Sequence, residues 1–331
     1  MNEISRQPRF LAIVNPTSGG QLGHELSAWL QQDAAAQHID LTIREIPDSN
    51  PIDELLSDVC SFDRVIAAGG DGTIMQVINC IVHQNVPLAI VPIGTGNALA
   101  KALKINLDAR TACTGALSDD CDRVALDLGL LNGKTYFALR LSIGYEAKVT
   151  QDTTRELKTR FGIFAYVIQA VRHLFYLNSI RFRFEVDGRQ IRRRAESVWV
   201  ANFGTLGMLG LDLDPSIVCD DGQLDLCAIH LGFRVSLRRA IQSMFGKQRL
   251  PADVLSRLPI KQYIKIAAAP RQLVQVDGEV VGETPCTIEC VPAGITVLVS
   301  RTLPTPTDKN TASPQQNSQQ LVPAITSDAR I

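Results

Sequence analysis

The sequence predicts an α/β protein of two domains, a doubly wound, Rossmann-like parallel sheet followed by an antiparallel β-sandwich. Strands and helices alternate over the first third of the chain, and the strands are continuously apolar, as in a parallel sheet buried on both faces. After about Asp122 the pattern changes to strands joined by Asn-Gly and Asp-Gly turns. The length of 331 residues suits two domains, which we place at residues 8–124 and 125–285.

The elements of the first domain follow from apolar periodicity. Apolar runs predict strands at 9–16, 39–46, 63–70 and 87–94. Helical spacing and start signals predict helices at 23–37, 50–61, 73–84 and 96–105. Ligands of such sheets bind beyond the carboxyl ends of the strands. The stretches NPTSGG, GGDGT and GTGN all fall at these ends.

The turn residues of the second domain indicate where its strands begin and end. The segments 123–144, 179–203, 223–231 and 264–300 read as strands with intervening hairpin turns. Two stretches with helical character interrupt them, at 152–177 and at about 233–247. The last segment, 303–331, is rich in Pro, Thr, Ser, Gln and Asn and lacks periodicity, so we expect a disordered tail.

Composition and charge narrow the class of protein. The formal net charge is -1, which gives no general positive field and argues against nucleic acid as a partner. The sequence shows no signal peptide and no apolar run of the roughly 18–20 residues that a membrane span requires, which favours a cytoplasmic protein. Eight cysteines are scattered without metal-site spacing, and we interpret them as free thiols.

Three glycine-rich turns carry the strongest chemical signal. Residues 14–20 (VNPTSGG), 69–73 (GGDGT) and 93–100 (IGTGNALA) each follow a strand and precede a helix. Backbone N–H groups in such turns, together with a helix N-terminus, can bind phosphate. Each turn alone is equally explained as a capped strand-to-helix connection, but three of them on one sheet edge favour a phosphate site. The Walker and dinucleotide glycine fingerprints are both missing from the sequence.

Acidic residues in the second domain offer partners for a metal or a reacting hydroxyl. VCDDGQLDL carries Asp220, Asp221 and Asp225, and VQVDGEVVGETP carries Asp277 and Glu279. Asp127 lies where the two domains join. An isolated Asp-Gly pair is more often only a hairpin turn, and that reading stays open for both stretches.

In order along the chain, NPTSGG, AAGGDGTIMQV, PIGTGNALAKAL, DDGQLDL and QVDGE resemble the diacylglycerol kinase catalytic-domain family, which includes bacterial lipid kinases and the sphingosine and ceramide kinases. The resemblance covers residues 8–301. It implies an α/β nucleotide domain and a β-sandwich domain that holds the lipid substrate, with ATP in the cleft between them. It also implies that a last strand, at 286–302, returns to the first domain.

The resemblance assigns roles to individual residues. ATP would contact two glycine-rich turns and a neighbouring threonine: Asn15, Pro16, Thr17, Ser18, Gly19, Gly69, Gly70, Asp71, Gly72, Thr73 and Thr95. Glu279 and Asp277 occupy the position of the catalytic base. The network around the catalytic Mg²⁺ would include Asp71, Asp127 and Asp220. A structural Mg²⁺ would be held by Val218, Asp221 and Gln223.

One departure from the family pattern concerns the metal. The usual GTGNDFA motif has an acidic residue where this chain has Ala98, so one member of the Mg²⁺ network is missing. Two alternatives to an ATP- and Mg²⁺-dependent lipid kinase remain. The GGDG loop is shared by NAD kinases, and Ala98 supports a nucleotide- or lipid-binding relative without turnover. The resemblance does not name the lipid, and a homodimer is left open.

A substrate that stays in a bilayer leads us to expect transient docking on anionic membrane. Residues 155–177 have helical character, with apolar positions such as Phe164 and cations such as Arg172. Arg192, Arg193 and Arg194 would add to the positive face. A helix that simply packs on the sandwich, beside a solvated strand edge, explains the same pattern equally well.

Overall fold

The computed structural model describes residues 6–20, 22–47, 52–144, 179–204, 214–229 and 255–301. The helical stretches predicted at 152–177 and 233–247, the predicted docking segment 155–177 and the predicted tail 303–331 lie outside the described residues. Within those ranges no helix combines the length and the apolar character needed to cross a membrane.

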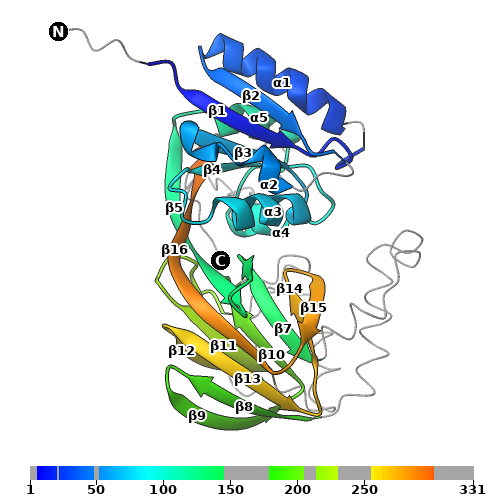
Figure 1. Ribbon diagram of the computed structural model, residues 1–331, viewed down its shortest axis with the longest axis vertical. Helices are drawn as coiled ribbons and strands as arrows, with labels where there is room; N and C mark the ends of the chain where they lie inside the picture. Colours follow the sequence, from blue (N-terminus) through cyan, green and yellow to red (C-terminus); the bar gives the residue numbers. More distant parts are fainter. Residues whose placement is uncertain are drawn as a thin grey trace, which may run out of the picture.

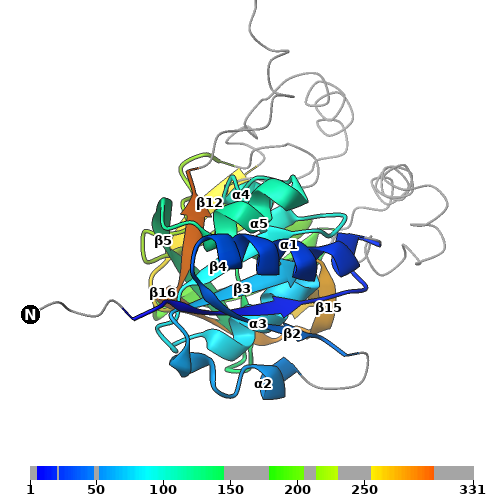
Figure 2. The ribbon, with the colours of Figure 1, turned by 90° about the horizontal axis from the view of Figure 1, so that it is seen from above.

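The first domain is a parallel sheet covered by helices on both faces (Figures 1 and 2). Its strands have the order β2-β1-β3-β4. Its elements are β1 (Arg9–Val14), α1 (Leu22–Ala36), β2 (Asp40–Glu45), α2 (Ile52–Leu55), the 3₁₀ turn η1 (Val59–Ser61), β3 (Arg64–Gly69), α3 (Asp71–Ile81), β4 (Leu88–Pro92), α4 (Ala98–Ala102) and α5 (Ala109–Leu117). Helices α1 and α5 cover one face, and α2 and α3 cover the other (Figure 2).

The alternation of side chains along β1 divides the core of this domain into two parts. Leu11 and Ile13 belong to a cluster that includes Ile74 and Val77 of α3. Phe10, Ala12 and Val14 face the opposite cluster, which includes residues of α1 and α5. Successive residues of a strand point to opposite faces, so a continuously apolar strand serves both clusters.

The second domain is made of two antiparallel layers. One has the order β12-β11-β10-β7-β14-β15, and the other contains β16, β13, β8 and β9. Its elements are β5 (Cys121–Leu131), β6 (Thr135–Phe137), β7 (Arg140–Gly144), β8 (Ile180–Val186), β9 (Arg189–Ala195), β10 (Ser197–Ala201), β11 (Leu224–Ile229), β12 (Leu255–Ile260), β13 (Tyr263–Ala269), β14 (Leu273–Val276), β15 (Glu279–Glu283) and β16 (Cys286–Ser300). Apolar side chains from both layers, among them Phe182, Leu141 and Val198, form one buried cluster.

Strand β16 joins the two domains through backbone hydrogen bonds. It pairs with β13 near Cys286, with β5 along most of its length, and in parallel with β4 at Val297. One layer of the sandwich is therefore continuous with the parallel sheet, in a single sheet of ten strands. The predicted two-domain α/β fold is confirmed. Helix α5 and strand β12 were not expected from the sequence.

Candidate functional site

The three glycine-rich turns pack against one another at the carboxyl ends of β1, β3 and β4. The N–H of Ile93 donates to the carbonyl of Gly69 at 3.0 Å. A Cβ on Gly19 would lie 2.7 Å from the carbonyl oxygen of Ile93, and one on Gly94 would lie 2.5 Å from the Cα of Gly70. Both distances are far shorter than van der Waals contact, so these glycines are required for the turns to meet.

Asn15 connects the first turn to the second. Its backbone N–H donates to the carbonyl of Ala68 at 2.9 Å, and its side-chain amide donates to Oγ1 of Thr73 at 2.9 Å. Its Oδ1 accepts from the backbone N–H and the hydroxyl of Thr17, at 3.1 and 2.8 Å. Ser18 closes the same turn by donating its N–H to the carbonyl of Asn15 at 3.1 Å. The predicted residues 15–19 and 69–73 therefore form one continuous surface.

The N-terminus of α3 is open at this surface. Gly70 precedes the helix in an extended conformation and provides no side-chain hydrogen bond to cap it. A Cβ on Gly72 would have no heavy atom within 4 Å, and neither would one on Gly20. Free N–H groups and the positive end of the helix dipole attract anions. The space beside Gly72 is open, which leaves this end of α3 accessible to an anion.

Asp71 joins the second turn to the third. Its Oδ1 accepts the N–H of Leu99 at 3.3 Å, and a Cβ on Gly96 would lie 2.7 Å from its Oδ2. Thr95 is exposed on the same turn. Asn97 adopts the left-handed conformation there, with φ 49°, and its buried Oδ1 has no hydrogen-bond partner among the described residues. Asp71 therefore lies within the surface formed by the three turns, although one of its carboxylate oxygens already accepts a hydrogen bond from α4.

Asp277 forms the turn between β14 and β15, as the hairpin interpretation of VDGE expects. Asp277 and Gly278 both have positive φ, 44° and 101°, and Val276 pairs with Glu279 across the turn. The Asp277 carboxylate accepts three backbone N–H groups: those of Ala138, Leu139 and Arg140, at 3.0, 3.1 and 2.8 Å. Burial raises the pKa of Asp277 to about 6, although the three donors act in the opposite direction.

Glu279 differs from Asp277 in every one of these respects. It is the first residue of β15, its side chain is exposed, and it makes no hydrogen bond or ion pair with any residue that the structure describes. The turn that presents it lies at the end of the sandwich that faces α3 and α4 (Figure 1). The two residues predicted as the catalytic pair are therefore unequal, because only Glu279 has a carboxylate free to accept a proton.

Asn202 was missed by sequence reasoning. It is fully buried and donates both amide hydrogens to backbone carbonyls, those of Asp127 at 2.7 Å and of Ala138 at 2.8 Å. Its own N–H donates to the carbonyl of Leu139 at 2.9 Å. Asn202 and Asp277 therefore hold residues 138–140 from two sides. The only signal in the sequence is a polar residue directly after the apolar strand SVWVA.

The buried carboxylate of Asp127 is also committed to backbone groups. Its Oδ1 accepts the N–H of Ala293 at 2.7 Å, and its Oδ2 accepts the N–H of Gly222 at 2.7 Å. Burial raises the pKa of Asp127 above its ordinary value, against the effect of these two donors. Asp127 anchors the 219–222 loop and the bulge of β16, and both of its oxygens already have partners in the protein.

The other residues predicted near metals lie on the loop before β11. Val218, Asp220 and Asp221 are exposed, and Oδ1 of Asp221 accepts the N–H of Gln223 at 3.1 Å. Asp225 is buried and paired with Arg257 at 2.6 Å. Among the residues described, no three His, Cys, Asp or Glu side chains are close enough together to hold a metal ion. The assignment of Mg²⁺ ligands stays a prediction.

One further contact ties α3 to the segment that Asp277 holds. The side-chain amide of Asn79 donates to the carbonyl of Tyr136 at 3.3 Å and accepts the N–H of Tyr136 at 2.9 Å. Tyr136 lies two residues before Ala138, the first partner of Asp277. The helix with the open N-terminus and the turn with the free carboxylate are therefore connected by a short path of hydrogen bonds.

Comparison with known proteins identifies the family to which this chain and its fold belong. Residues 9–127 match the family of the diacylglycerol kinase catalytic domain, and residues 140–299 match the YegS C-terminal NAD kinase beta sandwich-like domain. The chain belongs to the diacylglycerol kinase catalytic-domain family, as the order of its motifs predicts. A diacylglycerol kinase of Staphylococcus aureus is 30% identical over 222 residues, which span 66% of this chain and 69% of that protein.

Other relatives extend over more of the chain. A protein of Pectobacterium atrosepticum named a probable lipid kinase, YegS-like, is 26% identical over 298 residues, which are 88% of this chain and 96% of that one. The chain spans 54% of the length of an uncharacterized Synechocystis protein that is 27% identical. A solved diacylglycerol kinase structure from Bacillus anthracis has a TM-score of 0.67 and 21% identity, covering 90% of this chain and 98% of that one, which shows a shared fold.

Proposed function

We propose that this protein is a lipid kinase that transfers the γ-phosphoryl group of ATP, with Mg²⁺, to the hydroxyl of a lipid such as diacylglycerol. One arrangement carries the proposal: a free carboxylate at Glu279, on a turn that Asp277 anchors through three backbone hydrogen bonds and that faces the helix with the open N-terminus. A phosphoryl transferase needs a place for the phosphates and a base for the attacking hydroxyl. The other groups of the site support one of these two tasks.

The phosphates of ATP would bind at the N-terminus of α3 and along the 15–19 turn. Gly72 and Gly20 leave space there, whereas the close contacts of Gly19, Gly69 and Gly94 fix the shape of the surface. Thr95 stands exposed at its edge and can donate a hydroxyl hydrogen. Binding would therefore depend on backbone N–H groups and on the helix dipole, without a Walker lysine.

Glu279 would act as the general base, and Asp277 would position it. The exposed carboxylate of Glu279 can accept the hydroxyl proton as the phosphoryl group moves to the lipid oxygen. Asp277 cannot take this part in its present geometry, because its oxygens accept the N–H groups of residues 138–140. Only Gly278 separates Asp277 from Glu279 along the turn, so the anchored position of Asp277 helps to set where Glu279 lies.

Magnesium fits a site that is completed by the nucleotide. Mg²⁺ in kinases is commonly held by one or two carboxylates together with phosphate oxygens and water. Asp71 is the acidic side chain within the glycine turns and suits that arrangement, and Asp220 is exposed and free to join it. When bound, the ion neutralises charge on the phosphates. The carboxylate of Asp127 does not fit a direct ligand, since both oxygens accept backbone N–H groups.

A lipid substrate implies peripheral contact with a membrane surface. The sandwich domain is the proposed location of the acceptor lipid. The segment 155–177 remains a sequence-based candidate for docking, and it lies outside the described residues. The resemblance of residues 140–299 to an NAD kinase sandwich keeps NAD as the second acceptor to test.

A single assay decides between the two acceptors and a protein without turnover. The full chain is incubated with labelled ATP and Mg²⁺, together with NAD, with diacylglycerol in neutral detergent micelles, or with a panel of other lipid alcohols. We expect label in an organic-soluble phospholipid and none in NADP. The Glu279→Gln variant, with ATP affinity measured separately, is the control for contaminating kinases. Label in NADP, or no product from any acceptor, would overturn the proposal.

A further inference from the structure

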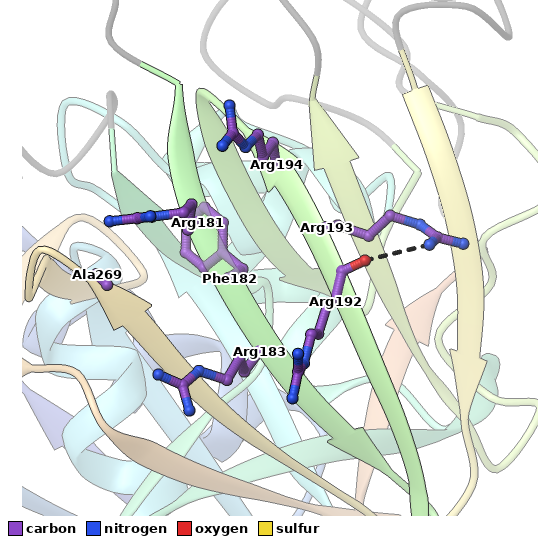
Figure 3. Close-up of a pocket in the computed structure, with 7 residues that line it drawn as sticks. All are labelled: Arg181, Phe182, Arg183, Arg192, Arg193, Arg194 and Ala269. Atoms are coloured by element: carbon purple, nitrogen blue, oxygen red, sulfur yellow. Dashed lines mark hydrogen bonds between the residues drawn. The ribbon is translucent and has the colours of Figure 1, made fainter.

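Five arginines gather on strands β8 and β9, at the end of the sandwich far from the glycine turns (Figures 1 and 3). Arg181 and Arg183 belong to β8, and Arg192, Arg193 and Arg194 belong to β9. All five are exposed. With Phe182 and Ala269 they line a shallow concavity of about 560 Å³.

The register of the two strands places four of these arginines on one face. Arg181 pairs with Arg194, and Arg183 pairs with Arg192. Phe182 and Phe184, which alternate with these arginines along β8, point into the core. Side chains directly opposite on neighbouring strands share a face, so Arg181, Arg183, Arg192 and Arg194 all project outward. We call these four the arginine face. Arg193 is paired with Phe182 and points the other way, donating to the carbonyl of Arg192 at 3.2 Å.

The positive charge of the arginine face is not neutralised by the described parts of the protein. Glu185 is the carboxylate next along β8 on this face, and it is already bonded to Lys265, Tyr263 and Gln190 at 2.9, 2.8 and 2.8 Å. None of the four arginines forms an ion pair with a described residue. Like charges opposite one another across a strand pair destabilise a sheet. In a chain with a net charge of -1, this concentration of cations calls for an anionic partner.

The directions of the side chains favour an extended partner over a single anion. In Figure 3 the labelled guanidinium groups fan out from the two strands, and they do not converge on one point. A pocket for one phosphate would aim several donors at the same atoms. Guanidinium groups bind phosphate oxygens through paired N–H donors and are weakly hydrated, which suits them to a layer of phospholipid head groups.

We propose that the arginine face docks this protein on a membrane surface rich in anionic phospholipid. The inference rests on the proposed function, which requires a lipid acceptor. It places docking on the outer β8–β9 face, which can be tested separately from the candidate segment 155–177. Contact by an edge of the sandwich also leaves the first domain free to exchange nucleotide with the solution.

The test is binding of the purified full chain to vesicles, without ATP. Co-sedimentation is measured with vesicles containing phosphatidylglycerol, with vesicles of phosphatidylcholine alone, and at increasing salt. The variant is Arg183→Gln with Arg192→Gln. The matched control is Arg123→Gln with Arg189→Gln, which removes two exposed charges elsewhere, since Arg189 is opposite the inward-facing Val186. A cation near such a surface contributes roughly fivefold, so we expect the variant to lose about tenfold or more and the control to lose little.

Two further readouts separate this proposal from loss of folding and from failure of the proposed function. Relief of the Arg183–Arg192 repulsion should leave the variant at least as stable as the wild type in thermal unfolding. Its kinase activity on diacylglycerol in neutral micelles should be unchanged. Equal vesicle binding by variant and wild type, or an equal loss in the control, would overturn the docking face. Arginine-dependent vesicle binding without kinase activity would support the docking face and contradict the lipid kinase.

Discussion

Asp277 and Asn202 bond the same residue, Ala138, from opposite sides. The carboxylate of Asp277 accepts the N–H of Ala138 at 3.0 Å, and the amide of Asn202 donates to its carbonyl at 2.8 Å. Asp277 lies 139 positions from Ala138 along the chain, and Asn202 lies 64 positions away. The orientation of the β14–β15 turn, and with it that of Glu279, is therefore fixed by residues of three separate segments.

The first prediction distinguishes a base from a positioning residue. Glu279→Gln should lower turnover by about 10²-fold or more, because it removes a general base, and should leave the free energy of unfolding and ATP affinity unchanged. Asp277→Ala should lower the free energy of unfolding by about 2–4 kcal/mol as well as turnover, because three backbone N–H groups lose their acceptor. Steady-state kinetics gives the turnover of both variants, and urea unfolding gives their free energy of unfolding. Loss of stability in Glu279→Gln would contradict the assignment.

The second prediction concerns pH. The pKa of Asp277 is about 6 in the folded protein, above its ordinary value of about 4 when unfolded. A raised pKa means that the native state binds the proton more tightly than the unfolded state does. The resulting contribution to the free energy of unfolding is fully present below about pH 4 and is lost as the pH rises through about 6. The free energy of unfolding of the wild type, relative to Asp277→Asn, should fall by about 3 kcal/mol over that range. If the difference in free energy of unfolding between the wild type and Asp277→Asn did not change with pH, the raised pKa of Asp277 would be refuted.

The third prediction tests Asn202. Asn202→Ala leaves the carbonyls of Asp127 and Ala138 without their buried donor, so we expect the free energy of unfolding to fall by about 2–4 kcal/mol. Asn132 is the matched control, because its side chain accepts one N–H, from Thr287, at an exposed turn. Asn132→Gly removes this acceptor without straining the left-handed backbone at φ 51°, and should cost about 1 kcal/mol or less. Chemical unfolding of both variants measures the two losses in free energy of unfolding. Equal losses would contradict a special role for the buried hydrogen bonds of Asn202.

The fourth prediction separates glycines that shape the site from a glycine that leaves space. A Cβ on Gly69 would lie 2.5 Å from Cβ of Thr73, so Gly69→Ala should destabilise the protein by about 1–3 kcal/mol. Gly72→Ala meets no atom and replaces a helical glycine, so it should raise stability by up to about 1 kcal/mol. If phosphate occupies that space, Gly72→Ala should weaken ATP binding by tenfold or more. Calorimetric titration measures the affinity of Gly72→Ala for ATP, and an unchanged affinity would place the phosphates elsewhere.

The fifth prediction concerns Asp71 and Ala98. Asp71→Ala should abolish activity and weaken Mg·ATP binding, because Asp71 is the acidic side chain within the glycine turns. Ala98→Asp supplies the carboxylate common in the family, at the first position of α4, and should leave activity intact or raise it. The dependence of the rate on Mg²⁺ concentration is the measurement. Inactivity of a folded Ala98→Asp protein would mean that the metal network differs from that of the family.

The sequence by itself determined the features that depend on neighbouring residues. Continuous apolar runs identified β1, β3 and β4, and glycines marked the turns after them. The Asp277-Gly278 pair specified a hairpin, because both residues accept positive φ. The sequence did not predict helix α5, because ARTACTGAL consists mainly of small and polar residues and lacks a clear apolar periodicity. It begins with a cap from Asp108, whose carboxylate accepts the N–H of Thr111 at 2.9 Å.

Only the tertiary structure decided the roles that depend on distant partners. Asp277 and Glu279 look alike in VDGE, yet three N–H groups from residues 138–140 occupy one carboxylate and leave the other free. The position of Asn202 after the apolar strand SVWVA does not reveal that its amide donates to the carbonyls of Asp127 and Ala138. The arginine face exists because the register of β8 and β9 sets Arg183 opposite Arg192. Hydrogen bonds and like-charge pairs act over a few ångströms in space, and the separation of residues along the chain does not limit them.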